Sequence, residues 1–171
     1  MSRTVLPSGE VLALLAAAPA RIASCTRRVS PDRLGRRPAP DEWSANEVLA
    51  HLRACADVWG GCITTILAEE HPTIRAINPR TWITGTGYPS LDFLPSFEAF
   101  SRQRQSLVAV LTALPDEGWR RPATVTGAGK ALERTVHSYA ERLATHERPH
   151  LRQIERAVAA SGRSDDGRTG G

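Results

Sequence analysis

The chain has 171 residues, of which 41% are hydrophobic and 23% charged, and it carries a net charge of +4. These values are typical of one globular domain and exclude a disordered or fibrous chain. Nearly all the basic residues are arginines scattered along the sequence, so a nucleic-acid surface is not indicated. No apolar run reaches the length of a membrane span, so we expect no membrane association. The three cysteines form no CxxC pair, which predicts no disulfide framework and favours a cytoplasmic protein.

The first predicted helix runs from about Ser8 to Arg27, with Ser8 as its N-cap. Its apolar positions recur every three or four residues, as one helix face requires. This spacing favours the first helix of the fold over a cleaved leader peptide. Pro19 falls inside the helix and should kink or split it. A loop rich in proline and arginine, residues 28 to 42, follows.

The second predicted helix opens at Ser44, where the sequence Ser-Ala-Asn-Glu places Glu47 at the capping-box position. It ends near Glu70, just before a His-Pro pair. Apolar residues at helical spacing define its inner face, and His51 lies on the same side. Trp43 and Trp59 are expected to be core residues.

A connection with four prolines occupies residues 71 to 95, and its Trp82 and Tyr88 are candidates for lining a cleft or a dimer contact. The third helix is predicted at 96 to 114 and the fourth at 131 to 160, with room for a short hairpin between them. Long connections allow crossovers between parallel helices. We therefore expect an all-α four-helix bundle with long crossover connections, as one domain over residues 1–160. Residues 161–171 should form a disordered tail.

Two histidines four residues apart, His146 and His150, lie in the apolar stripe of the fourth helix. Residues at this spacing are neighbours on one face, so both rings can reach one metal ion. His51 is the candidate third ligand, because His137 points about half a turn away from the pair and His71 begins a loop. The sequence thus predicts a divalent-metal site made by His51, His146 and His150.

Other residues near this site have two interpretations each. Cys55 is a soft ligand or, as we favour, a core filler, and Gln153 orients His150 or makes an ordinary interhelical hydrogen bond. Arg104 binds an anionic substrate group or the acidic part of a thiol cofactor, or it pairs with an acidic neighbour. Glu147 is a base near the metal or a charge on the helix surface. Arg104 and Glu147 are therefore our candidate catalytic residues.

The segment from His146 to His150 also matches HExxH, the zinc-peptidase motif in which the glutamate activates water. Pro149 lies inside the motif and removes a helical hydrogen bond there. The chain also ends soon afterwards and leaves little room for the rest of a peptidase. A metallopeptidase is thus the least favoured alternative.

Three segments together resemble the DinB-like (damage-inducible) superfamily, which includes bacillithiol- and mycothiol-dependent S-transferases. They are WSANEVLAHL, the arginine-containing FEAFSRQRQSL and HERPHLRQI, and the resemblance covers roughly residues 10 to 158. It implies a four-helix bundle, often dimeric, in which His51, His146 and His150 hold Ni, Zn or a similar divalent ion.

A three-histidine site with exchangeable positions can lower the pKa of a bound water or hold a thiol as its thiolate. The thiol-transferase relatives imply the second chemistry. We therefore expect a metal-dependent thiol S-transferase or a related metalloenzyme, which would act on a small electrophile with a low-molecular-weight thiol. The alternative is a non-catalytic bundle in which the histidine or metal cluster is structural.

Overall fold

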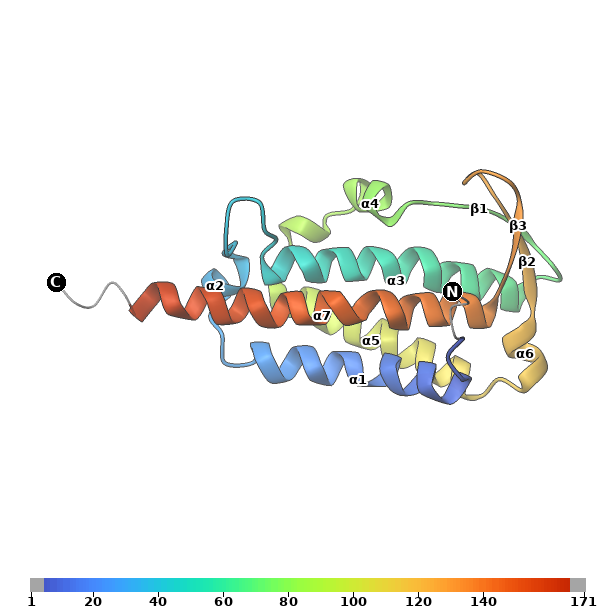
Figure 1. The fold of residues 1–171 in the computed structure, drawn as a ribbon, viewed down its shortest axis with the longest axis horizontal. Coiled ribbons are helices and arrows are strands. Elements are labelled where there is room, and N and C mark those ends of the chain that lie inside the picture. Colours follow the sequence, from blue (N-terminus) through green and yellow to red (C-terminus); the bar gives the residue numbers. More distant parts are fainter. Residues whose placement is uncertain (1–4, 167–171) are drawn as a thin grey trace.

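The computed structural model describes residues 5–166, with side chains up to residue 162. Four long helices form a bundle, as predicted (Figure 1). They are α1 (Ser8–Thr26), α3 (Ala45–Ala68), α5 (Phe93–Thr112) and α7 (Val136–Asp166). A short helix, α2 (Pro31–Gly35), lies in the loop between α1 and α3.

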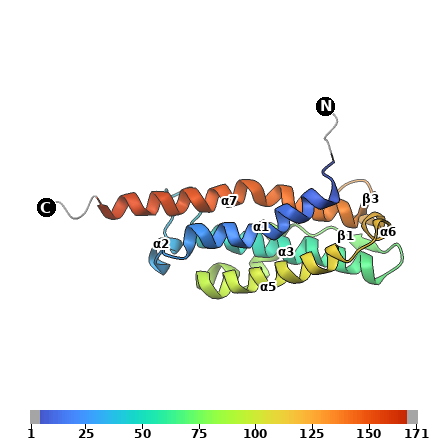
Figure 2. The ribbon, with the colours of Figure 1, turned by 90° about the horizontal axis from the view of Figure 1, so that it is seen from below.

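The arrangement and directions of the four long helices require a crossover connection. α7 and α5 each pack against both α1 and α3, so α5 and α7 lie on one diagonal and α1 and α3 on the other. In Figures 1 and 2, α3 and α5 run in one direction while α1 and α7 run in the opposite direction. Because α3 and α5 are consecutive long helices that run parallel, the chain must return along the bundle between them. The crossover predicted from the long connection is confirmed.

The two long connections meet in a small sheet at the end of the bundle where α3 ends and α7 begins (Figure 1). The first connection contains β1 (Thr73–Arg75), α4 (Pro79–Trp82), η1 (Ile83–Gly85) and η2 (Tyr88–Ser90). The second contains α6 (Asp116–Arg120), β2 (Pro122–Thr126) and β3 (Leu132–Thr135). β1 pairs parallel with β2, and β2 pairs antiparallel with β3. The predicted hairpin is present, and β1 adds a third strand beside it, so the helical bundle carries a small sheet at one end.

Local sequence signals set the ends of the helices. The capping box of α3 is complete: the Glu47 backbone N–H donates to Ser44 Oγ at 3.1 Å, and the Ser44 N–H donates to the Glu47 carboxylate at 2.9 Å. α1 continues through Pro19 as one helix. α7 continues through Pro149 and ends at Asp166, six residues beyond the boundary predicted at residue 160. The first part of the predicted disordered tail is therefore helical, and residues 167–171 lie outside the described residues.

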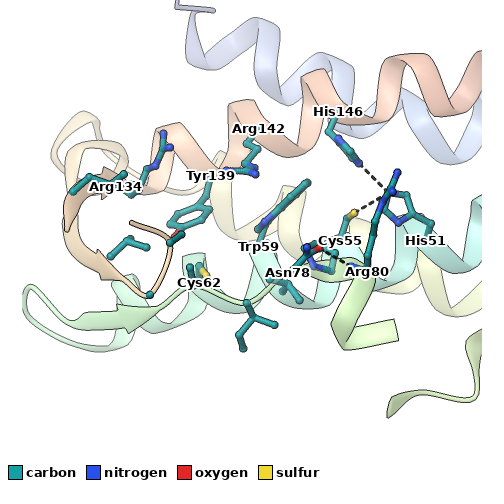
Figure 3. A pocket seen from close by; sticks show the side chains of 18 residues that line it. His51, Cys55, Trp59, Cys62, Asn78, Arg80, Arg134, Tyr139, Arg142 and His146 are labelled. Atoms are coloured by element: carbon teal, nitrogen blue, oxygen red, sulfur yellow. Dashed lines mark hydrogen bonds between the residues drawn. The ribbon is translucent and has the colours of Figure 1, made fainter. Parts of the chain in front are cut away.

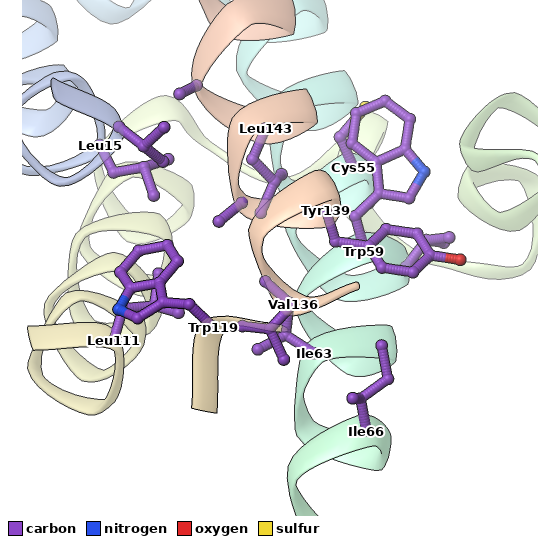
Figure 4. Close-up of a cluster of buried hydrophobic side chains, with 14 of the residues drawn as sticks. Leu15, Cys55, Trp59, Ile63, Ile66, Leu111, Trp119, Val136, Tyr139 and Leu143 are labelled. Carbon is purple, nitrogen blue, oxygen red and sulfur yellow. The ribbon is translucent and has the colours of Figure 1, made fainter. Parts of the chain in front are cut away.

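The core consists of two clusters of buried apolar side chains along the bundle. The first joins all four helices and α6 through residues such as Leu15, Ile63, Leu111, Trp119 and Leu143 (Figure 4). The second lies toward the opposite end of the bundle and includes Ile22, Leu49, Phe100 and Ile154. Fully burying one such side chain stabilises a fold by roughly 1.5–3 kcal/mol, so these clusters hold α3 and α7 side by side.

Within the described residues, α1 is the only helix long and apolar enough to cross a membrane by length and composition. Its apolar face is already used in the bundle. Val11, Leu15, Ala18 and Ile22 are each at most 1% exposed. α1 thus packs one apolar face into the bundle and leaves the other side at the surface.

Candidate metal centre

Three histidines converge between α3 and α7, and we call His51, His146 and His150 the histidine cluster. His51 Nε2 lies 3.1 Å from His146 Nε2. The ring centroid of His150 is 4.8 Å from that of His51 and 4.7 Å from that of His146. Pro149 therefore leaves the two histidines of α7 side by side, and the cluster predicted from the sequence does assemble.

The spacing of the ring nitrogens fits a shared metal ion. Histidine nitrogens bind zinc at about 2.0–2.1 Å, so two of them on one ion lie roughly 2.9–3.4 Å apart at angles from octahedral to tetrahedral. The His51–His146 distance falls in this range. The same distance also allows one ring to donate a hydrogen bond to the other when no ion is bound.

A hydrogen bond orients the third ring. His150 Nδ1 lies 3.0 Å from Gln153 Oε1, and a carbonyl oxygen can only accept, so the Nδ1–H donates. The lone pair of His150 is then on Nε2. Metal-binding histidines usually have their second nitrogen held by such a partner. Of the two interpretations of Gln153, the structure supports the orienting one.

Cys55 lies at the same centre. Its Sγ is 3.5 Å from His51 Nε2, and the ligand atoms of His51, Cys55 and His146 all lie within 4.8 Å of one another. The side chain is fully buried, as a core filler would be, yet its position also makes it a fourth donor. Burial raises the pKa of the Cys55 thiol to about 12, so the protein alone keeps it protonated.

Burial also fixes the protonation of the histidines. Burial, with the neighbouring His150 as the second cause, lowers the pKa of His51 and of His146 to about 4. Both rings are therefore neutral near neutral pH. Neutral imidazole is the form that binds a metal ion.

Two tryptophans frame the histidine cluster. The Trp59 ring meets His146 edge-on, with centroids 5.0 Å apart. Trp43 lies 5.3 Å from His51 and is stacked with His150 at 6.4 Å. The sequence predicts that both tryptophans are core residues. Trp59 is only 6% exposed, but it also lines the cavity described next, and Trp43 is half-buried beside the rings.

A cavity of about 500 Å³ opens next to the cluster (Figure 3). His51, Cys55 and His146 are at one end of it. Its walls come from α3 and α7, from residues 76–80 of the crossover and from the hairpin of β2 and β3. A volume of this size is ordinary for a small-molecule site. The candidate metal centre is thus open to a ligand.

The two candidate catalytic residues lie elsewhere. Arg104 and Glu147 form a bidentate ion pair in the core, with both side chains 2% exposed. Arg104 Nη1 donates to the Glu147 carboxylate at 2.7 Å and to the Leu15 carbonyl at 3.2 Å. Neither residue lines the cavity. Of the two interpretations of Arg104, the structure supports the pairing with an acidic neighbour. Glu147 is buried, so it is not a charge on the helix surface, and its carboxylate is engaged by Arg104. Its role as a base near the metal stays a prediction.

The remaining histidines stay apart from the cluster. His137 Nε2 lies 2.9 Å from the Leu6 carbonyl, and His71 Nε2 lies 3.3 Å from the hydroxyl of Thr124. Trp82 and Tyr88, the aromatic residues of the crossover, both donate hydrogen bonds to Asp57. They anchor the crossover to α3 and do not line the cavity beside the cluster.

The fold and the cluster define a helical-bundle protein with a candidate histidine metal centre. More specifically, the chain belongs to the DinB superfamily, whose sequence model matches residues 14–154. The structure of YfiT from Bacillus subtilis has the same fold, with a TM-score of 0.77 over 95% of this chain and 93% of that chain at 17% sequence identity. YfiT is described as a probable metal-dependent hydrolase with an unusual four-helix bundle topology. A comparison with curated proteins finds no match. The relation to bacillithiol- and mycothiol-dependent S-transferases stays a prediction.

Proposed function

We propose that this protein is a metal-dependent enzyme whose divalent ion is bound by His51, His146 and His150. The observation that carries the proposal is the meeting of His51 and His146, with Nε2 atoms 3.1 Å apart, at the end of an open cavity. The His150 ring lies beside both, with its centroid 4.8 and 4.7 Å from theirs. Imidazole donors with a nearby thiol suit Zn, Ni or a similar ion. When bound, the ion would supply a nucleophile near neutral pH by lowering the pKa of water or of a thiol.

The protein's own residues prepare the site for this role. Burial keeps His51 and His146 neutral, and Gln153 leaves the Nε2 of His150 available. Cys55 offers a further donor when an ion lowers the pKa of its thiol. The rigid pairing of α3 and α7 holds the rings in place before an ion arrives, which reduces the entropy lost on binding.

Two reactions follow from an activated nucleophile. Hydrolysis is the first, since YfiT has the same fold and is described as a probable metal-dependent hydrolase. Transfer of a low-molecular-weight thiol to an electrophile is the second. The cavity of about 500 Å³ supports it, because that volume is large enough for two small molecules at once. Direct access from the cavity to the cluster favours either reaction over a purely structural metal.

Metal analysis and activity assays on one preparation test the proposal. We expect stoichiometric Zn or Ni by elemental analysis, and turnover of model esters or thiol conjugation to an electrophile that a chelator abolishes. His137→Ala is the matched control for His146→Ala, because both residues are on α7 and only His146 belongs to the cluster. A protein that cannot be loaded with metal would overturn the proposal. Tight metal without turnover in either assay would assign the cluster a structural role.

A further inference from the structure

Three arginines from three different elements line the cavity. Arg80 comes from α4, Arg134 from β3 and Arg142 from α7 (Figure 3). No aspartate or glutamate lines the cavity, and none of these three arginines forms an ion pair with any residue from 5 to 162. Side chains alternate between the two faces of a strand, which explains why the glutamate of β3 stays outside the cavity. Leu132 and Arg134 line the cavity, and Glu133 between them does not. The cavity therefore has an uncompensated positive charge.

Two of the arginines lie next to the histidine cluster. Arg142 precedes His146 by one helical turn, and its Cζ is 4.5 Å from the centre of the Trp59 ring. The Cζ of Arg80 is 5.7 Å from the Trp43 ring. Stacking on an aromatic face holds a guanidinium while its N–H edge stays free for a ligand.

The charges around the cavity, together with those of a bound metal ion, indicate the charge of the ligand. A divalent ion on three neutral imidazoles would keep a charge of +2, or +1 with the Cys55 thiolate also bound, and the guanidinium groups add to either. Arg80 and Arg142 are exposed, so water solvates their charges in the free protein. A carboxylate or phosphate replaces that water with charge-assisted, bidentate hydrogen bonds to arginine, which a neutral molecule does not form. Much of the rest of the wall is apolar and accommodates a hydrophobic body; this part includes Val58, Trp59, Ile77, Val125 and Leu132.

We propose that the cavity binds a small organic oxyanion, a carboxylate or a phosphate ester with an apolar body, through Arg142 and Arg80. This assignment of a substrate class rests on the proposed function, because it places the anion beside the metal. Arg134 lies at the far end of the cavity and adds positive charge there (Figure 3).

Binding of matched aromatic probes to the zinc-loaded protein tests the assignment. The probes are 2-naphthoate, 2-naphthyl phosphate and the neutral 2-naphthamide, and their Kd values are measured by calorimetry. We expect at least one anion to bind about tenfold or more tightly than the amide, with affinity that falls as salt rises. The order of the two anions distinguishes a carboxylate ligand from a phosphate ester.

Charge-matched variants then locate the binding group. Arg142→Gln should weaken the preferred anion about tenfold and leave 2-naphthamide unchanged. Arg156→Gln on the same helix removes the same charge from an exposed position outside the cavity, and it should change neither Kd. Equal Kd values for the anions and the amide, or for wild type and Arg142→Gln, would overturn the inference.

Zinc affinity measured on the same proteins separates the two proposals. Intact zinc binding without anion preference overturns only the ligand assignment. Failure of the wild type to bind zinc overturns the proposed function, whatever the anion results are.

Discussion

The buried ion pair between Arg104 and Glu147 makes a strong prediction about stability. Glu147→Leu removes one partner and leaves the Arg104 guanidinium, 2% exposed, without its counter-charge. Removing one partner of a buried ion pair costs about 3–5 kcal/mol. For a domain of this size that corresponds to a fall in Tm of roughly 10 °C. The pair also lies across the bundle diagonal, between α5 and α7, so its loss affects the packing of all four helices.

The chain provides a matched control on the same helix. Glu155 pairs with Arg21 at 2.6 Å, but these side chains are 39% and 40% exposed. Glu155→Leu should therefore lower the free energy of unfolding by no more than about 1 kcal/mol. Adding Arg104→Met to Glu147→Leu should recover most of the loss, because the double variant no longer buries an unpaired charge.

Urea denaturation of the metal-free proteins, followed by circular dichroism, measures these differences without the contribution of bound metal. The reasoning is refuted if Glu147→Leu costs no more than Glu155→Leu. Loss of activity in Glu147→Leu with unchanged stability would instead restore the catalytic role expected from the sequence.

The remaining predictions concern the metal centre. Replacing any member of the histidine cluster by alanine should lower zinc affinity by more than about 100-fold in calorimetry, whereas His137→Ala should not change it. Gln153→Leu should lower zinc affinity about 10- to 100-fold with the far-UV spectrum unchanged, since only the orientation of one ring is lost. If Cys55 is a ligand, the cobalt-loaded protein shows a thiolate charge-transfer band in the near ultraviolet that disappears in Cys55→Ser; a band that persists would contradict this. Metal-free protein should lose stability in urea as pH falls from 6.5 to about 4, because His51 and His146 bind protons at their ordinary pKa only when unfolded. A flat profile over this range would show that the rings are not buried as described.

The helices and the histidine cluster could be predicted because their signals are local and periodic. A capping box marks the start of α3, and spacings of three and four place His51, His146 and His150 on inner faces. The strand β1 could not be predicted in this way. It has only three residues, and its partner β2 lies about fifty residues later, so no local pattern encodes the pairing.

Glu147 shows a second limit of local patterns. The prediction gave α7 one inner face, but α7 packs against α1 as well as α3. Glu147 follows His146 in the sequence and lies about 100° further round the helix, so its side chain points into the core rather than toward the histidines. For a related reason, the sequence did not predict that Arg80 and Arg142 line one cavity. Their convergence depends on how α4 lies over the bundle, and no local sequence pattern encodes that placement.

The cavity is built from two kinds of structure. The candidate metal ligands are on the two most closely packed helices, whereas much of the opposite wall comes from the crossover and the hairpin, which β1 and β2 tie together. Substitutions in those wall segments can change which molecule fits without moving a ligating ring. Within this architecture, reactivity and selectivity can therefore diverge independently during evolution.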